Sequence, residues 1–292
     1  MQKITPYLWF DHQAETAINF YVSLFHNSKI NSIHRFETDR PENDGQVLTM
    51  DFQLEGLQFM ALNGGPVFTF SPAVSFFVFC ELEEEINRLW EKLSEGGMEM
   101  IALDQYPFAE RYGWVQDRFG VSWQLILSPN TQKIVPCFLF VGEQHGKAES
   151  AIHFYTSIFK DSKITRLERY EAEDEGVEGT IKHARFLLHN QEFIIMESSL
   201  DHQFGFTPAI SFFVDCESQE EVDYFWERLS QGGQIEQCGW LKDQFGVSWQ
   251  IVPSVLGELM ADPDPEKAQR VTQAMLQMTK IEIEGLWRAY RA

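Results

Sequence analysis

The sequence is short of cysteine and of basic residues, and it contains no long apolar run. Its four cysteines include no CxxC pair, which argues against zinc ribbons and thioredoxin-type redox sites. No apolar stretch approaches the roughly 18 residues that a membrane span requires, and the first residues do not read as a secretion signal. We therefore expect a cytoplasmic protein that does not associate with membranes, with free and buried thiols.

Acidic residues far outnumber basic ones. Asp and Glu total 44 against 23 Lys and Arg, which gives a net charge of −21 in a chain of 292 residues. Such a surface repels phosphate backbones and anionic lipid, so nucleic acid and membrane surfaces are excluded as partners. Because an excess of Glu usually serves solubility, the acidity by itself indicates no function. Hydrophobic residues make up 44% of the chain, which is typical of a globular protein.

The chain contains the same unit twice, in the same order. The segment SPAVSFFVFCELEEEINRLWEKLSEGG at 71–97 returns as TPAISFFVDCESQEEVDYFWERLSQGG at 207–233, with sixteen identical positions. A polar joint with turn residues, SPNTQK, separates the two copies. We therefore divide the chain into a first module at 1–128, a second module at 133–253 and a C-terminal tail at 254–292.

Each module mixes strands and helices in a fixed order. In the first, an apolar strand at 5–10 precedes an amphipathic helix, an acidic loop at 37–45 and a hairpin within 47–63. A further strand leads to a second helix that ends at Gly96-Gly97, as a left-handed C-cap requires. A final hairpin follows, and its DRFG turn has Asp first and Gly fourth, which suits a type I turn. This order predicts an α+β fold with helices on one face of the sheet.

The tail carries the signals of one more helix. Asp264 is expected to be its N-cap and Pro265 its first residue. Apolar residues at helical spacing then predict an amphipathic helix over residues 265–279. Packing against its own chain is the favoured role of this helix, and a homodimer contact is the alternative.

Several motifs together resemble a known family. The segments ITPYLWFD, AETAINFY, LEGLQFMALNGG, FSPAVSFFV and GWVQDRFGVSWQL are similar to the PhnB-like branch of the glyoxalase/bleomycin-resistance/dioxygenase superfamily, also called vicinal oxygen chelate. The second module repeats the last motif as GWLKDQFGVSWQI. The resemblance implies two tandem βαβββ glyoxalase-like modules that form a pseudo-twofold pair around ligand cavities. Members of this branch are often labelled 3-demethylubiquinone-9 3-methyltransferases.

The methyltransferase label does not fit the glycine pattern. A nucleotide-derived cofactor usually lies over a Gly-rich turn between a strand and the start of a helix. Here Gly64-Gly65 precedes Pro66, and the other two glycine pairs follow helices instead of opening them. We therefore interpret methyl transfer as an inherited name.

The superfamily resemblance also implies a divalent metal held by His and Glu side chains on strands. Transferred one by one, these ligand positions fall on residues without a carboxylate or an imidazole. In the first module they are Thr5 or Pro6, residues 73–75 and Gln124. In the second module they are Val135 or Pro136, residues 209–211 and Gln250. Because hard metals need such donors, we predict no metal cofactor of the ancestral kind. A metal site with rearranged ligands, formed by His183, Glu197 and Gln250, is the alternative.

Two polar positions allow more than one interpretation. His183 and Arg185 share a strand face and are candidates for an acid/base or anion-binding pair, but their repeat equivalents are Thr49 and Asp51, which favours an ordinary sheet surface. Glu197 follows an apolar strand; a solvated strand end is favoured over a place in a cavity. The candidate ligand contacts are Tyr7, Trp9, Asn63, Trp114, Gln124, His183, Arg185, Glu197, Trp240 and Gln250.

The favoured function is the binding of a small, partly apolar molecule in an aromatic cavity, as the resemblance to bleomycin-resistance proteins implies. No catalytic residue is assigned. A metal-dependent lyase, isomerase or dioxygenase is the first alternative, and an assembly or regulatory role through the acidic surface and the tail is the second.

Overall fold

The fold is described from a computed structural model, which covers residues 2–36 and 45–292. The acidic loop expected at 37–45 therefore lies almost wholly outside the described residues. The chain forms two compact units. One is Pro6–Ile210, and the other joins the start of the chain, through Thr5, to Ser211–Ala292. Each unit contains a hydrophobic cluster of its own.

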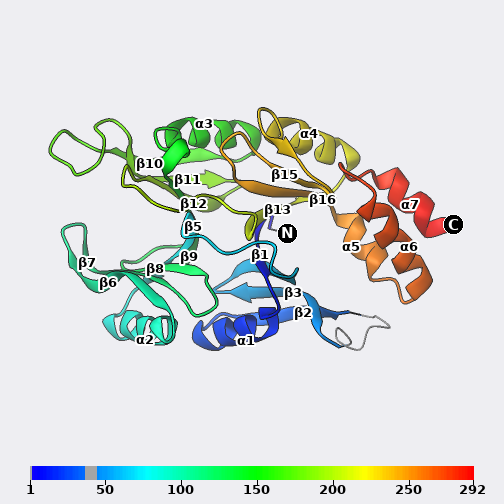
Figure 1. The fold of residues 1–292 in the computed structure, drawn as a ribbon, viewed down its shortest axis with the longest axis horizontal. Helices are drawn as coiled ribbons and strands as arrows, with labels where there is room; N and C mark the ends of the chain where they lie inside the picture. The colour runs from blue at the N-terminus through cyan, green and yellow to red at the C-terminus, as the bar shows by residue number, and fades with distance from the viewer. Residues whose placement is uncertain (1, 37–44) are drawn as a thin grey trace. The chain divides into compact units, whose positions relative to one another are not determined.

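Strand, helix and three strands follow one another twice within each module, in the part of the chain that the structure describes (Figure 1). The first module contains β1 (Ile4–Phe10), α1 (Ala14–Leu24), β2 (Lys29–Arg35), β3 (Val47–Leu54) and β4 (Leu57–Asn63), then β5 (Val74–Cys80), α2 (Glu83–Ser94), β6 (Met98–Tyr106), β7 (Ala109–Gln116) and β8 (Ser122–Leu127). The predicted α+β fold of tandem βαβββ modules is confirmed, with the refinement that each module holds this unit twice.

The second module repeats the order with the same kinds of element. It contains β9 (Ile134–Phe140), the 3-10 helix η1 (Gly142–Gln144), α3 (Ala148–Ile158), β10 (Lys163–Arg169), β11 (Ile181–Leu188) and β12 (Gln191–Glu197), then β13 (Ile210–Cys216), α4 (Gln219–Leu229), β14 (Gln234–Ile235), β15 (Trp240–Lys242) and β16 (Ser248–Pro253). The tail forms α5 (Ser254–Met260), α6 (Pro265–Leu276) and α7 (Ile283–Arg291).

Both modules contribute strands to one sheet, which we call the shared sheet. Its order is β10-β11-β12-β9-β5-β8-β7-β6, and it lies within the unit Pro6–Ile210. In its middle β5 pairs antiparallel with β9, so that Ser75 lies opposite Cys137 and Phe77 opposite Val135. Each module therefore completes its sheet with a strand of the other, which is the arrangement expected of a paired fold.

Strands β1 and β13, which are the repeat equivalents of β9 and β5, are joined by backbone hydrogen bonds as well. Within one unit the Trp9 amide donates to the Ala209 carbonyl at 2.8 Å, and within the other the Asp215 amide donates to the Lys3 carbonyl at 3.1 Å. The remaining strands of these groups pair as β1-β4-β3-β2 and as β13-β16-β15-β14. The two modules therefore use the same strands in the same way.

The signals for turns and helix ends correspond to real features. Gly96 and Gly232 both have φ +73°, the left-handed conformation predicted at the ends of α2 and α4. The turn before β8 is closed by the Gly120 amide, which donates to the Asp117 carbonyl at 2.9 Å. The buried Asp117 carboxylate accepts hydrogen bonds from the Tyr21 hydroxyl and the Trp123 indole. The turn is thus connected to the core under α1.

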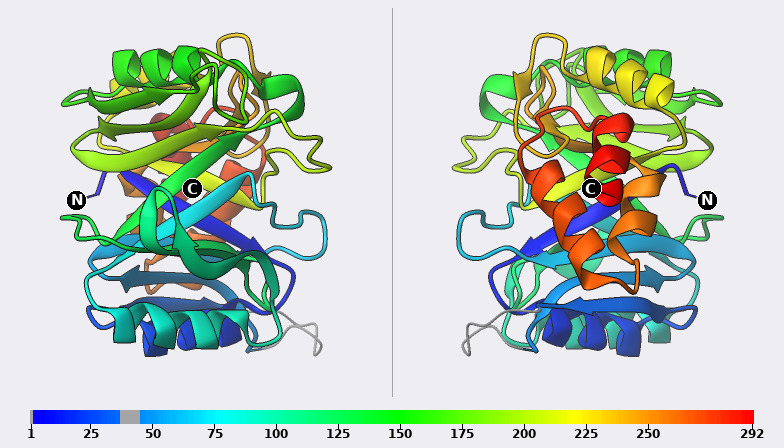
Figure 2. Two further views of the ribbon diagram at one scale, coloured as in Figure 1. Left: turned by 90° about the vertical axis from the view of Figure 1, so that its left-hand side faces the viewer. Right: turned by 90° about the vertical axis from the view of Figure 1, so that its right-hand side faces the viewer.

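The tail packs against its own chain, as favoured from the sequence. Asp264 caps α6 by accepting a hydrogen bond from the Glu266 amide, with Pro265 in the first position. The helix ends at Leu276, three residues before the predicted end, and the sequence analysis did not predict α5 or α7. Helices α5, α6 and α7 lie side by side (Figure 2). Their apolar residues form one cluster with Val252 and Phe213 of the second module.

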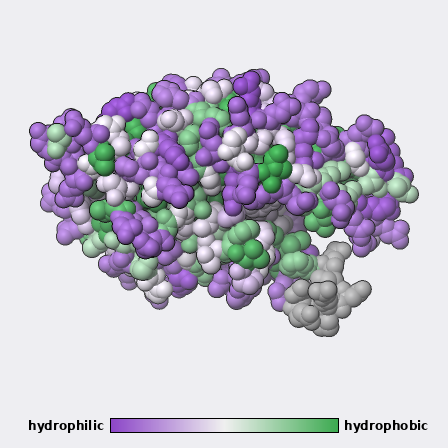
Figure 3. Space-filling model, turned by 45° about the horizontal axis from the view of Figure 1, so that its top comes forward, coloured by the Kyte–Doolittle hydropathy of each residue, from purple (hydrophilic) through white to green (hydrophobic). Residues whose placement is uncertain are grey.

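In the described part of the chain, none of the helices combines the length and the apolar character needed to cross a bilayer. Polar residues cover most of the face drawn in Figure 3, where apolar side chains form only small patches. This agrees with the interpretation of the acidic excess as a solvated surface.

Candidate functional site

The candidate site is the inner face of the shared sheet, which we define as the face opposite the helices. Alternation along the strands places Trp123 and Phe138 on the helix side, where their rings contact Tyr21 of α1 and Tyr155 of α3. The next residues point to the inner face. The buried inner-face cluster consists of Phe77, Phe79, Tyr112, Trp114, Val135, Cys137, Leu139, Val141 and Ile194.

A chain of neutral hydrogen bonds occupies the centre of this face. The Tyr112 hydroxyl donates to Oε1 of Gln124 at 2.5 Å, and Nε2 of Gln124 donates to the Ser75 hydroxyl at 2.8 Å. Cys137 lies opposite Ser75 on the neighbouring strand. Burial raises the pKa of the Tyr112 hydroxyl and of the Cys137 thiol, so both groups stay protonated at neutral pH. The centre of the face is therefore polar but uncharged.

Aromatic rings surround this polar centre. Tyr106 and Phe108, at the tip of the β6–β7 hairpin, stack on each other at 5.7 Å between centroids, and Phe108 contacts the Tyr112 ring edge-on at 5.1 Å. Phe108 is 67% exposed. The Trp114 indole donates to the Ser122 hydroxyl at 2.6 Å, which fixes its ring on the face. The hairpin tip thus covers one side of the polar centre with exposed aromatic surface.

His183 lies on the inner face, and the structure corrects the expectation of an ordinary surface residue. Its ring approaches the Phe77 ring edge-on at 6.4 Å, and its Nδ1 is buried without a hydrogen-bond partner. Burial lowers the pKa of His183 to about 4, so the ring is neutral at pH 7. A buried nitrogen without a partner is rare in native proteins and marks a position where a ligand could supply one.

Arg185 lies beside His183 but is already engaged. Its guanidinium donates to the Glu192 carboxylate and to the Asn130 side chain, both at 2.6 Å, and lies 5.1 Å from the Phe79 ring centroid. The predicted pair is therefore brought together on one face, with the charge of Arg185 neutralised by Glu192. An anion would have to displace this carboxylate, which makes anion binding here unfavourable.

Asn63 and Glu197, which are repeat equivalents, are structural. The Asn63 carbonyl oxygen accepts from the Ala14 amide at the start of α1 at 2.9 Å. Glu197 likewise accepts from the Ala148 amide at the start of α3 and from the Ile181 amide, at 3.1 and 2.6 Å. Glu197 is only 2% exposed, so the expectation of a solvated strand end is wrong. Both side chains face the helices and not the inner face.

The remaining candidates lie elsewhere. The Trp9 indole donates to the Gly65 carbonyl at 2.8 Å and lines an open hollow of about 470 Å³ in the first module. Tyr7 is buried on β1, and its pKa is raised by burial and by Asp51. In the other unit Trp240 pairs with Gln250 in strand register, and Gln250 donates to the Ser211 hydroxyl at 2.9 Å. Of the ten predicted contacts, the inner face of the shared sheet thus brings together Trp114, Gln124, His183 and Arg185.

The ancestral metal does not fit the residues at this site. The inner-face positions on β5, β8, β9 and β12 offer the Ser75 hydroxyl, the Gln124 amide, the protonated Cys137 thiol and the Ile194 alkyl group. A divalent ion bound there would lack the anionic or imidazole donors that such ions need. Nor do three His, Cys, Asp or Glu side chains cluster in a metal-binding arrangement anywhere in the described ranges. His183 and Glu197 face opposite sides of the sheet, so a single ion cannot contact both.

Sequence reasoning missed three residues of the polar centre as ligand contacts: Ser75, Tyr112 and Cys137. Ser75 enters the sequence analysis only as a metal position, and Cys137 stands one residue beyond the position transferred to Val135 or Pro136. The available signal was alternation, because Val135, Cys137 and Leu139 must share one face of β9. Which face that is could not be known before the pairing of β5 with β9.

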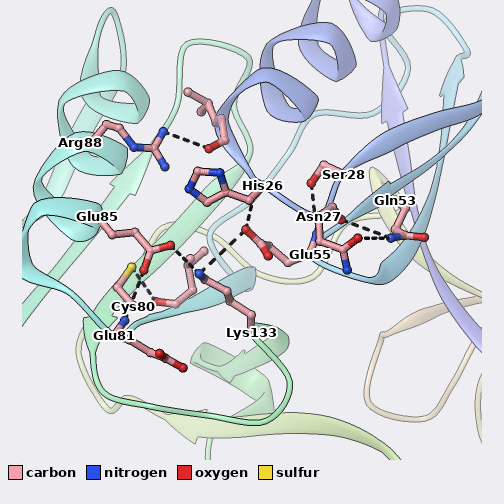
Figure 4. Close-up of polar contacts among 12 residues, drawn as sticks. His26, Asn27, Ser28, Gln53, Glu55, Cys80, Glu81, Glu85, Arg88 and Lys133 are labelled. Atoms are coloured by element: carbon pink, nitrogen blue, oxygen red, sulfur yellow. Dashed lines mark hydrogen bonds and ion pairs between the residues drawn. The ribbon is translucent and has the colours of Figure 1, made fainter.

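A second polar cluster lies at the junction of the modules and has a structural role. Lys133 of the joint contacts Glu85 of α2 at 2.5 Å and Glu55 at 4.0 Å, and Glu55 also accepts from the His26 amide at 2.9 Å (Figure 4). The repeat equivalents of Lys133 and Glu85, Lys3 and Glu221, form the same ion pair at 2.7 Å. These charges are paired with one another and leave the inner face as the candidate site.

The glycine pairs also have structural explanations. Gly64 lies under the Trp9 indole, where an added Cβ would approach ring atoms to 2.2 Å. Gly96 and Gly232 end helices in the left-handed conformation. These pairs are therefore required by packing and by helix ends, and their presence does not indicate a nucleotide-derived cofactor.

The repeated βαβββ order and the sheet shared between the modules define a glyoxalase-like fold. The family model described as 3-demethylubiquinone-9 3-methyltransferase matches residues 2–126 and again residues 132–252. The chain therefore belongs to this family. The resemblance inferred from the sequence motifs is confirmed.

Two solved structures resemble the chain. A PhnB protein of Bacillus cereus, described as a 3-demethylubiquinone-9 3-methyltransferase, is 45% identical over 44% of this chain and 100% of its own, with a TM-score of 0.42. Glyoxalase I from Zea mays is 12% identical over 84% of this chain and 89% of its own, with a TM-score of 0.53. The second likeness shows a common fold that spans both modules. No curated protein matches the chain.

Proposed function

We propose that the protein binds a small, partly apolar molecule on the inner face of the shared sheet. The observation that carries the proposal is the buried Nδ1 of His183, which has no hydrogen-bond partner on a face lined mainly by aromatic and aliphatic side chains. The Ser75–Gln124–Tyr112 chain supplies hydrogen-bonding groups at the centre of the same face. Apolar lining with a few convergent polar groups is typical of small-molecule sites.

The charge state of the face selects the kind of ligand. His183 is neutral, the Tyr112 and Cys137 protons are retained, and Arg185 is paired with Glu192. A charged ligand would lose hydration without gaining an opposite charge, which is costly in a buried site. The ligand is therefore uncharged where it contacts this face, with one polar group for His183 and apolar or aromatic surface for the surrounding rings.

Entry to the face requires a movement of the protein. Its aromatic residues are nearly closed to solvent, with Phe77 at 4%, Tyr112 at 4% and Trp114 at 7% exposure. The β6–β7 hairpin carries the exposed Phe108 at its tip and packs Tyr106 against the face. Because exposed hairpin tips open at low free-energy cost, we assign this hairpin as the element that moves aside when the ligand enters.

Calorimetry against a panel of metabolites and antibiotics tests the binding proposal. At least one uncharged, partly aromatic compound should give saturable heat. The variant that combines His183→Ala with Trp114→Ala should bind that compound with an affinity at least tenfold lower. Trp287→Phe, on the tail helix α7, is the matched control and should leave the affinity unchanged. Absence of saturable heat from every compound, or equal affinity in all variants, would contradict the proposal.

We further propose that binding proceeds without a divalent metal of the ancestral kind, which makes the metal-dependent lyase, isomerase or dioxygenase the weaker alternative. The support is the donor set on the inner face, since a hydroxyl, an amide and a protonated thiol bind such ions poorly. Elemental analysis of protein purified without chelator should find less than about a tenth of an equivalent of Mn, Fe, Ni or Zn. A full equivalent of one of these metals in the native protein, absent from Gln124→Ala, would overturn this part of the proposal. Methyl transfer is not proposed, because the glycine pairs are explained by packing and by helix ends.

A further inference from the structure

The two modules differ most in the hairpin before their last strand. In the first module residues 98–112 lie between Gly97 and Gly113, whereas only residues 234–238 lie between the equivalent Gly233 and Gly239. Strands β6 and β7 have nine and eight residues, and their counterparts β14 and β15 have two and three. The second module has therefore lost most of the hairpin that covers the polar centre in the first.

The C-terminal tail occupies the place of the lost hairpin. The Cys238 amide donates to the Met278 carbonyl and the Gly239 amide to the Thr279 carbonyl, both at 2.8 Å. In the first module the equivalent residue Tyr112 pairs with Asp104 of β6. In the second module the backbone of the tail therefore accepts hydrogen bonds next to β15. In the first module the equivalent position next to β7 is occupied by β6.

The packing at the two equivalent glycines shows the same replacement. A Cβ added at Gly113 would lie 3.0 Å from Cα of Leu103 on β6, and one added at Gly239 would lie 3.2 Å from Cγ1 of Ile281 in the tail. Ile281 is fully buried. The tail therefore supplies both the hydrogen-bond acceptors and the apolar side chain that the shortened hairpin no longer provides.

The tail also covers the equivalent of the inner face in its own unit. Phe213 and Val252, the repeat equivalents of Phe77 and Ile126, pack in one cluster with the tail residues Leu256, Leu259, Val271, Ile281 and Leu286. Helix α5 starts directly after β16, and Ser254 donates to the Asp215 carboxylate at 2.7 Å. Side chains of the chain itself thus fill the surface that corresponds to the aromatic face of the shared sheet.

Polar contacts fasten the tail to α4. Gln219 accepts from the Ile283 amide at 2.8 Å and donates to the Ile281 carbonyl at 3.2 Å, and Lys280 pairs with Asp223 at 2.5 Å. These contacts lie on both sides of Ile281. They indicate that this segment of the tail is docked against the module by specific contacts.

We propose that the C-terminal tail is a built-in occupant of the inner face of β13–β16. Residues 278–283 replace the missing hairpin, and α5 to α7 fill the apolar surface behind it. The chain consequently offers its ligand face on the shared sheet and not on the equivalent face of β13–β16. This last step rests on the proposed binding function, whereas the docking of the tail does not.

The reactivity of Cys238 tests the docking without any ligand. Cys238 is partly exposed and next to the tail, while Cys80, Cys137 and Cys216 are buried. In Ile281→Asp we expect Cys238 to react with a thiol reagent at least tenfold faster than in the native chain, with the buried thiols still protected. Glu284→Ala, an exposed change in α7, is the control and should leave the rate unchanged.

Should Ile281→Asp expose all four thiols together, Gln219→Ala provides the comparison, because it removes the hydrogen bonds to residues 281 and 283, together with one to Asp223 on the same helix, and places no charge in the core. An unchanged Cys238 rate in both variants would overturn the docking of the tail.

Titration with Nile red, an uncharged apolar dye, tests the covering of the face. The Ile281→Asp chain should bind at least one more dye molecule than the native chain, since Ile281 no longer covers the face. Equal dye stoichiometry in the two chains would overturn the covered face. The thiol and dye results decide the role of the tail whether or not the compound panel finds a ligand, so the two proposals fail separately.

Discussion

At the residue scale, His183 links stability to pH. Its folded pKa of about 4 lies below the ordinary value of 6.5, because burial outweighs the opposing effect of Glu168. Arg166 and Arg185 lower this pKa further, and Glu192 raises it. A histidine with a depressed folded pKa takes up its proton more readily in the unfolded chain. Its contribution to stability is therefore complete above the unfolded pKa and is lost as the pH falls toward 4.

This linkage predicts a measurable difference between variants. When the pH falls from 7 to 5, the depressed pKa of His183 should lower the free energy of unfolding by about 1–2 kcal/mol. In His183→Gln that part of the pH dependence should disappear in denaturant titrations, whereas His153→Asn, at an exposed position of α3, should retain it. Identical pH slopes for the native chain and His183→Gln would show that the ring is not buried as described.

The residues also show where sequence reasoning reaches its limit. The turn at Asp117 and the cap at Asp264 were predictable because both depend on hydrogen bonds to amides two to four residues away. The burial of His183 was not, since it depends on Phe77, which belongs to the other module. Glu197 was misjudged for the same reason, because its partners Ala148 and Ile181 are distant in sequence.

At the element scale, close packing between strands and helices leaves no space for a side chain at Gly113. An added Cβ would lie 2.5 Å from the Trp90 ring of α2 and 3.0 Å from the Leu103 backbone. Gly113→Ala should therefore lower the free energy of unfolding by about 1–3 kcal/mol, as overpacking usually does.

The control is a glycine whose Cβ would meet nothing. Gly257 lies inside α5, and no atom comes within 4 Å of an added Cβ. Gly257→Ala should raise the free energy of unfolding by up to about 1 kcal/mol through helix propensity. The same change in both variants would contradict the packing of β7 against β6 and α2.

Elements with strong alternation or helical spacing were predictable, and weak ones were not. Strand β3 begins at residue 47, where the predicted hairpin begins, because its apolar residues alternate and one face is buried. Strand β2 was missed because most of its residues are exposed, as befits the last strand in its group. Helix α7 was missed because it has only nine residues and no counterpart in the repeat that could support its assignment.

At the scale of the whole molecule, the chain resembles a dimer joined by residues 128–133. The β5–β9 pairing and the Lys133–Glu85 ion pair both connect the two modules. The twofold repeat was evident in the sequence, but the exchange of strands could not be predicted, because both modules have the same apolar pattern and either pairing would bury it. A homodimer through the tail helix stays a prediction from the sequence.

Separating the modules tests the exchange. Residues 1–130 and 131–292, expressed as two chains, should copurify in equal amounts, because each leaves an edge strand, β5 or β9, that needs its partner. Lys133→Glu should weaken the association by placing three carboxylates together, and Lys147→Glu, on an exposed residue, is the control. Two stable monomers that do not associate would contradict the shared sheet.

The central claim is that an uncharged small molecule, and not a metal ion, is held over the polar centre of the shared sheet. The most direct measurement is a crystal structure of protein taken from cells without chelator or added ligand. We predict electron density for an organic molecule that contacts His183 and Trp114, with Gln124 still bonded to Ser75. A coordinated cation at Gln124, or an inner face that stays closed with every aromatic ring in place, would contradict the account.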